Sequence, residues 1–179
     1  MQIINCPEEY QKESFETAVF MGGGMSSTEW HEIFIDELQK YNSQIVLYNP
    51  YNANIVDTQT QINWEFKYLN QYINDYFIFS MYFDKYTKQP MSMYELGRAS
   101  VLCKPANVTL ETPIGTKVNA TFNYGFPMVI SLHAESPILD EVASQLNILG
   151  IPYKVRTPRE HAKEVYLQYK YIKATRRVV

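Results

Sequence analysis

The residue with the clearest chemical potential is Glu95, which lies in the apolar segment Pro90-Met-Ser-Met-Tyr-Glu-Leu-Gly-Arg-Ala-Ser100. Its spacing from Ser92 predicts a capping box, in which the serine accepts a hydrogen bond from a backbone N–H and the glutamate reaches back to the helix start. A carboxylate held ionised by the unpaired N–H groups of a helix N-terminus also suits attack on an electron-poor carbon. The pattern alone leaves both roles open.

Other acidic residues are weaker candidates for catalysis. Glu65, Asp75 and Asp84 lie in the same half of the chain as Glu95. For each of them, a solvated or helix-capping role is favoured over a chemical one, because isolated acids are seldom buried and often cap helices or turns.

Histidines and cysteines show no pattern of a metal or nucleophile site. His31, His133 and His161 lack an H-E-x-x-H or similar spacing, and Cys6 and Cys103 are far apart with no C-x-x-C motif. No G-x-S-x-G segment of a serine hydrolase is present. We therefore expect no metal and no disulfide framework, and a reducing compartment fits the cysteine content.

A glycine-rich turn follows the first predicted strand and comprises Gly22, Gly23, Gly24 and Met25. Such a turn can bring backbone N–H groups against an anion or a sugar. It matches neither the P-loop nor the dinucleotide fingerprint, since no G-K-[ST] follows and Ser27 stands at the third glycine position. A tight turn and a ligand contact remain equally open, and no cofactor is expected.

Composition indicates one ordinary globular domain over residues 1–179, with 46% hydrophobic and 20% charged residues. The 15 tyrosines are unusual, and most are expected in the core or at subunit contacts. A net charge of −3 argues against a non-specific nucleic-acid binder. No apolar run is long enough for a membrane helix and the first residues lack a signal-peptide pattern, so we expect a cytoplasmic protein.

Alternating apolar runs and amphipathic segments must position these residues. Five apolar runs predict strands, at residues 17–21, 43–48, 76–81, 107–110 and 127–132, and residues 151–155 can add a short one. Helical spacing predicts helices over residues 26–41, 60–74, 137–149 and 161–174, and a further helix that opens at Pro90 and is stopped by Lys104-Pro105. A polar lead-in is expected before residue 15 and a loop over 111–125. The fold expected is an α/β, flavodoxin-like doubly wound sheet of about five mainly parallel strands with helices on both faces.

Four segments combine into a more specific pattern: Val19-Phe-Met-Gly-Gly-Gly24, Gln61-Ile-Asn-Trp-Glu65, Asn74-Asp75-Tyr-Phe-Ile-Phe79 and Tyr94-Glu-Leu-Gly-Arg-Ala-Ser100. Together they resemble the nucleoside 2-deoxyribosyltransferase family, which includes the 2′-deoxynucleoside 5′-phosphate N-hydrolases. The resemblance spans residues 17–110 and is most specific at Y-E-L-G-R-A, whereas residues 127–174 match only by fold.

The resemblance implies that Glu95 attacks the anomeric carbon of a nucleoside and carries the sugar as a covalent ester, before a second base or water takes it. Many members have an aspartate six residues earlier to help the leaving base, but Gln89 stands there. Asp84 is the nearest substitute, and Asp75 is an alternative farther from the rim of the sheet. The sequence does not decide between Asp84 and Asp75 as the residue that protonates the leaving base.

The resemblance also suggests a substrate and an assembly. The phosphohydrolase branch has a basic residue in its glycine loop, whereas Gly24 and Met25 offer none, which favours an unphosphorylated nucleoside. Tyr48 and Trp64 are candidates to stack on the base, although a core role is as plausible for each, and Ser92 is a further candidate contact. A homo-oligomer is implied, and the alternatives are a 5′-monophosphate N-glycosidase or a non-catalytic nucleotide-binding protein.

Overall fold

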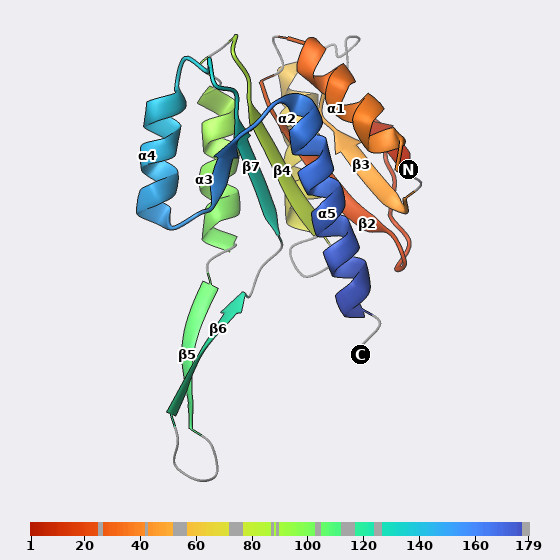
Figure 1. Cartoon of the computed structure of the whole chain (residues 1–179). Coiled ribbons are helices and arrows are strands. Elements are labelled where there is room, and N and C mark those ends of the chain that lie inside the picture. Colours follow the sequence, from red (N-terminus) through yellow and green to blue (C-terminus); the bar gives the residue numbers. More distant parts are fainter. Residues whose placement is uncertain are drawn as a thin grey trace.

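A computed structural model describes residues 1–24, 27–41, 43–51, 57–71, 77–86, 88, 90–102, 105–111, 117–123 and 127–176. The fold is α/β, with a six-stranded, all-parallel sheet of order β1-β3-β2-β4-β7-β8 (Figure 1). The strands are β1 (Gln2–Asn5), β2 (Thr17–Gly23), β3 (Ile45–Asn49), β4 (Phe77–Phe83), β7 (Met128–Leu132) and β8 (Tyr153–Val155). The doubly wound α/β fold predicted from the sequence is confirmed, since β3-β2-β4-β7-β8 follows the flavodoxin order.

Five helices in the described part of the chain cover the two faces of the sheet (Figure 1). They are α1 (Glu29–Gln39), α2 (Thr58–Gln71), α3 (Pro90–Leu102), α4 (Leu139–Leu149) and α5 (Pro158–Arg176). Buried residues of α1 and α5 share one cluster with one face of the sheet, and those of α2, α3 and α4 share a second cluster with the other. None of the described helices is both long and apolar enough to cross a membrane.

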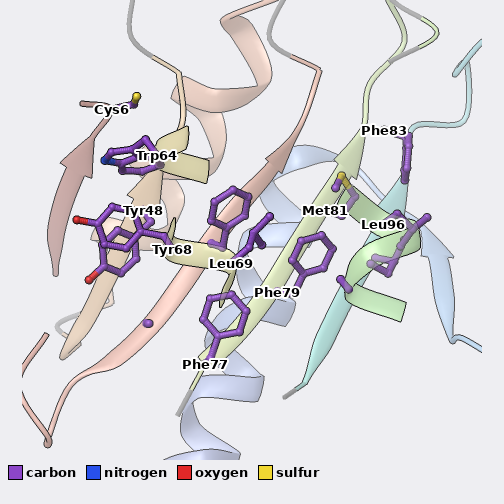
Figure 2. Close-up of a cluster of buried hydrophobic side chains, with 14 of the residues drawn as sticks. Cys6, Tyr48, Trp64, Tyr68, Leu69, Phe77, Phe79, Met81, Phe83 and Leu96 are labelled. Carbon is purple, nitrogen blue, oxygen red and sulfur yellow. The ribbon is translucent and has the colours of Figure 1, made fainter. Parts of the chain in front are cut away.

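The central strands β2 and β4 are buried along their whole length, as continuous apolar runs predict for inner strands of a parallel sheet. Figure 2 shows one of the two faces, where side chains of β4 meet α2 and α3. The labelled members from these elements are Trp64, Tyr68, Leu69, Phe77, Phe79, Met81, Phe83 and Leu96. This packing fixes α2 and α3 against the same strands.

Two predictions of strand content need correction. Residues 2–5, expected to belong to a polar lead-in, form the edge strand β1, which pairs with β3. Residues 107–110, expected in the main sheet, lie in β5 (Pro105–Glu111), which pairs antiparallel with β6 (Lys117–Asn123) in a region predicted to be a loop. The reason lies in the pattern: β5 alternates apolar and polar residues, as a half-buried strand does, instead of running apolar throughout.

The hairpin β5–β6 extends away from the sheet (Figure 1). It connects the C-terminal end of α3 to the start of β7, and therefore lies toward the amino ends of the parallel strands. Ligand sites of doubly wound sheets lie at the opposite, carboxyl edge.

The predicted capping box at the start of α3 is wrong. The helix begins at Pro90, so Ser92 lies inside the first turn and Glu95 lies in the second. Proline suits the first helical position, because its fixed φ matches the helix and its missing N–H has no partner to lose there. The predicted cap at Ser26 lies outside the described residues, whereas Gly150 does end α4, with a left-handed φ of 67°.

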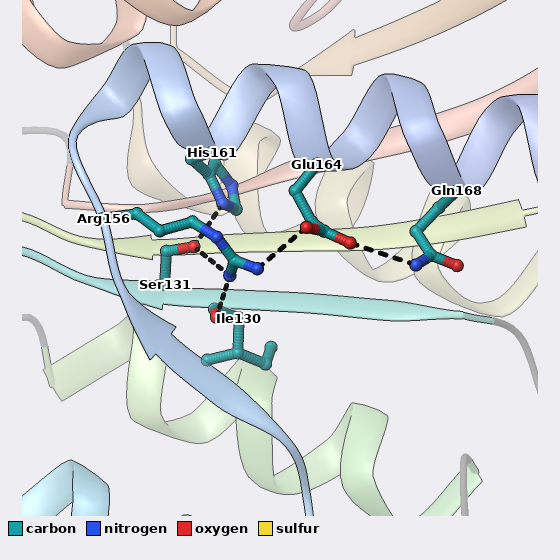
Figure 3. A network of polar contacts seen from close by, with 6 residues as sticks. All are labelled: Ile130, Ser131, Arg156, His161, Glu164 and Gln168. Atoms are coloured by element: carbon teal, nitrogen blue, oxygen red, sulfur yellow. Dashed lines mark hydrogen bonds and ion pairs between the residues drawn. The ribbon is translucent and has the colours of Figure 1, made fainter.

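A buried polar network joins α5 to the sheet. The ring of His161 lies between Ser80 Oγ on β4 and Ser131 Oγ on β7, each 2.8 Å from one ring nitrogen. Arg156 donates to Ser131 Oγ at 3.2 Å and to a Glu164 carboxylate oxygen at 2.9 Å (Figure 3). A neutral imidazole has one donor and one acceptor, and a serine hydroxyl can match either, so every polar atom of this fully buried ring is satisfied.

Candidate functional site

The carboxyl group of Glu95 lies between the carboxyl ends of β2 and β4. A Cβ atom placed on Gly22 would be 3.3 Å from Oε2 of Glu95 and 2.7 Å from Cε of Met81. The chain leaves β2 toward β3 on one side and leaves β4 toward β7 on the other, so the strand order reverses between β2 and β4. Doubly wound sheets bind their ligands at this switch point.

A second carboxyl group, that of Glu65, meets Glu95 from α2. Both residues are 6% exposed, and their side chains are joined by a hydrogen bond. Gln61 lies one turn earlier on α2, where the i,i+4 spacing places it beside Glu65, and its Nε2 donates to Oε1 of Glu65 at 2.6 Å. The structure therefore contains an acidic pair with an amide donor on one member.

The solvated or capping role favoured for Glu65 is wrong, since Glu65 is buried against Glu95. One feature of the local sequence could have indicated that Glu65 is buried. Trp64 and Tyr68, which are also buried, flank Glu65 on the same side of the helix. The partner residue lies on another helix, so no spacing along the chain identifies it.

The environment acts differently on the pKa values of the two carboxyl groups. Burial, the charge of Glu65 and the hydrogen bond that protonated Glu95 donates to it together raise the pKa of Glu95 well above its usual range. Burial also raises the pKa of Glu65, but hydrogen bonds from Gln61 and Glu95 act in the opposite direction. Two carboxylates in contact cannot both ionise cheaply, and the directions of the two shifts make Glu95 the better proton holder of the pair.

An acidic pair that shares one proton can supply both an acid and a nucleophile. This is the division of labour of enzymes that break glycosidic bonds, where one carboxyl group protonates the leaving group and a carboxylate stabilises or captures the positive sugar carbon. The location at the switch point of the sheet puts this chemistry where a small ligand is expected.

The glycine turn borders the acidic pair and is packed by α1. Gly23 has φ of 146°, and a Cβ there would lie 2.5 Å from the carbonyl oxygen of Tyr82 and 2.6 Å from the ring of Trp30. Trp30 also donates from Nε1 to the Gly24 carbonyl oxygen at 2.8 Å. Glycine is therefore required at position 23, and Met25 lies outside the described residues.

Replacing Gly23 by alanine is expected to lower the free energy of unfolding by about 2 kcal/mol or more, because the new Cβ meets rigid backbone and a positive φ. Urea denaturation measures the effect. Gly97→Ala is the matched control: nothing lies within 4 Å of an added Cβ there, and the same change in the helix α3 is expected to stabilise by about 0.5–1 kcal/mol. A stability unchanged by Gly23→Ala would contradict the turn geometry.

His31 is a residue at this rim that sequence reasoning missed. It lies in the first turn of α1, is 4% exposed, hydrogen-bonds the Gly24 backbone and packs against Tyr51 with ring centroids 5.1 Å apart. Burial lowers its pKa to about 4, so the ring is neutral at pH 7. Its Nδ1 has no hydrogen-bond partner within the described part of the chain. The signal available was its position in the first turn of the helix that follows the glycine turn.

Asp84 is not brought together with Glu95. It follows β4, but it lines a small pocket on the α1 and α5 side of the sheet with Trp30, Tyr82 and His133. Its Oδ1 accepts from the backbone N–H of Tyr86 at 2.8 Å. Asp75, the other acid proposed to assist the leaving base, lies outside the described residues.

The aromatic residues predicted as stacking partners serve the core. Tyr48 is fully buried and donates to the carbonyl oxygen of Tyr10 at 3.0 Å, and Trp64 donates to the carbonyl oxygen of Glu8 at 2.7 Å. Their rings pack on each other and on Tyr68. The core role weighed for them is the one that the structure shows.

Ser92 is buried on the same helix as Glu95, three residues before it, so the two side chains project from neighbouring positions of one helix face.

Within the residues that the structure describes, no group of three or more His, Cys, Asp or Glu side chains is arranged to hold a metal ion. In comparisons with known proteins, no family model and no curated protein sequence matches this chain.

Proposed function

We propose that the protein is an N-glycosidase or N-glycosyltransferase that acts on nucleosides, with Glu95 as the nucleophile and Glu65 as its acid–base partner. The observation that carries the proposal is the buried Glu65–Glu95 pair at the switch point between β2 and β4. The resemblance to nucleoside 2-deoxyribosyltransferases points to the same glutamate independently of the geometry.

The pair supports a balanced reaction. An oxygen of the Glu95 carboxylate forms a bond to C1′ as the C1′–N bond breaks, and the departing base nitrogen takes the proton that the pair held. In the second half, a new base or a water molecule attacks C1′, the ester bond breaks, and the proton of the incoming group returns to the pair. Nearby carboxylate charge stabilises the positive sugar carbon in both steps.

The electrostatics of the turn favour an unphosphorylated nucleoside. His31, beside Gly24, is neutral at pH 7, because burial lowers its pKa to about 4. It therefore provides hydrogen bonds to a sugar hydroxyl rather than positive charge for a 5′-phosphate. A cytoplasmic location and a homo-oligomer belong to the same proposal, which rests for both on the sequence.

Base exchange tests the proposal directly. The purified protein is incubated with each 2′-deoxynucleoside and a different free base, and the nucleosides and bases are separated by liquid chromatography. We expect a new nucleoside when an acceptor base is present and slower base release when only water is. Neither exchange nor release with any of the deoxynucleosides or ribonucleosides would refute the enzymatic proposal.

A further inference from the structure

We infer that Gln61 is a positioning residue that keeps Glu65 ionised and so places the single proton of the pair on Glu95 in the free protein. The inference rests on the proposed function for its catalytic meaning, but the proton position itself is a property of the folded protein and can be measured without substrate.

The geometry is specific to one member of the pair. Gln61 Nε2 lies 2.6 Å from Oε1 of Glu65, a short contact of an amide donor with a carboxylate oxygen. A hydrogen bond from an amide stabilises the ionised form of the carboxyl group that accepts it more than the protonated form, whose oxygens are weaker acceptors. Within the described residues, the charged group that raises the pKa of Glu95 is Glu65.

The charged and titratable groups around the pair, in the part of the chain that the structure describes, do not supply another proton holder. From the loop after β1, Cys6 faces Glu65, and burial followed by the charges of Glu65 and Asp57 raises the pKa of its thiol to about 11. That thiol is therefore neutral at pH 7. Asp57, just before α2, is exposed and has its pKa lowered by hydrogen bonds from Thr60, so it does not take up the proton of the pair. On the sheet side, Gly22 and Met81 carry no charge.

The assignment has a consequence for the reaction. In the free protein Glu95 carries the proton, so the nucleophile is masked until that proton leaves. The proton passes along the hydrogen bond to Glu65 and then to the departing base nitrogen, while the Glu95 oxygen bonds to C1′. The pair therefore keeps the nucleophile protonated until the nucleobase of the substrate is in place to accept the proton. No acid other than the pair is needed to protonate the leaving nucleobase.

Gln61→Met tests the inference, because methionine keeps the length of the side chain and removes the donor. Protein labelled with ¹³C at the glutamate side-chain carboxyl carbons is titrated by NMR, and the resonances of the pair are assigned from Glu65→Gln and Glu95→Gln. In the wild type, the carboxyl carbon of Glu95 is expected to remain at its protonated position at pH 7. In Gln61→Met, both apparent pKa values of the pair are expected to rise by about one pH unit.

Two further variants sharpen the test. Gln61→Lys places a positive charge beside Glu65 and is expected to lower both apparent pKa values, opposite to the methionine variant. Gln59→Met is the matched control: it removes an i,i+4 hydrogen bond of 2.9 Å, from Gln59 to Asn63, on the exposed side of the same helix, and should leave the titration unchanged. In active protein, the pH–rate profile is expected to move in the same directions.

The inference is overturned if Gln61→Met titrates like Gln59→Met, or if the wild-type proton resides on Glu65. A protein that shows the NMR shifts but no action on nucleosides would retain the positioning role of Gln61 and refute the proposed function. Exchange activity with unshifted titrations would do the reverse.

Discussion

Glu95→Gln is expected to reduce nucleoside base exchange by about 10³-fold or more while the protein remains folded. An amide is a poor nucleophile toward C1′, so no sugar ester forms and the two-step route is closed. The substitution changes neither the length nor the volume of the side chain appreciably. The loss is therefore expected in kcat, with the affinity for the nucleoside largely kept.

Stability provides the second readout for this variant. Protonated Glu95 donates a hydrogen bond to Glu65, and the side-chain amide that Glu95→Gln introduces can donate one in its place. The free energy of unfolding is therefore expected to change by less than about 1 kcal/mol, within the range of a single neutral hydrogen bond. Urea denaturation at pH 7 measures it.

A control separates this effect from the loss of any glutamate. Glu141→Gln on α4 changes an exposed residue on a helix that does not carry the pair, and it should leave exchange unchanged. Mass spectrometry of wild-type protein quenched during turnover is expected to show a sugar adduct that is missing in Glu95→Gln. Full exchange activity in Glu95→Gln would place the chemistry on another residue.

The strands that could be predicted are those whose local sequence carries a strong and uniform hydrophobic pattern. The runs that became β2, β3, β4 and β7 are mostly apolar and do not alternate, which is the pattern of an inner parallel strand buried on both faces. β1 and β6 were missed because they are short or polar on alternate residues, and their pairing partners are supplied by tertiary structure. Strand content at the edges therefore depends on contacts that a local pattern does not contain.

In the candidate site, the sequence pointed to Glu95 but not to its partner Glu65, because the contact between them depends on tertiary structure. Glu95 stands out through its segment and its place after a buried strand, whereas Glu65 is a candidate only because α2 and α3 pack against the same strands and bring two acids together. The spacing of Ser92 and Glu95 suggested a cap, but Pro90 starts the helix earlier. Asp84 follows β4 as expected, yet it faces the α1 side of the sheet, which sequence alone did not distinguish.

The second large effect is expected in the acid stability of the fold and comes from His161. The ring is fully buried between Ser80 and Ser131, and burial, together with the charge of Arg156, lowers its pKa from 6.5 to about 3. Between these values the unfolded chain binds a proton that the folded protein excludes. Stability therefore falls as pH drops below 6.5 and levels off near pH 3.

The magnitude follows from the width of this window. Each pH unit is worth about 1.4 kcal/mol, so His161 alone is expected to remove about 5 kcal/mol between pH 6.5 and 3. His31 acts in the same direction down to its lowered pKa of about 4. The raised pKa of Glu95 acts in the opposite direction, because the folded protein holds a proton that an unfolded glutamate releases.

His161→Gln isolates the contribution of this one ring. The variant is expected to be less stable than the wild type at pH 7, since the space between Ser80 and Ser131 is shaped for an imidazole ring. Its free energy of unfolding should fall by about 3 kcal/mol less than that of the wild type between pH 7 and pH 4.5. Urea denaturation at the two pH values measures this difference, and the contributions of His31 and Glu95 cancel because both proteins carry them. Between pH 7 and 8 the ring is neutral in both the folded and unfolded chain, so there the two proteins should respond alike. Parallel stability curves from pH 7 to 4.5 would show that His161 is not buried as a neutral ring, and the polar network that holds α5 on β4 and β7 would then need a different protonation.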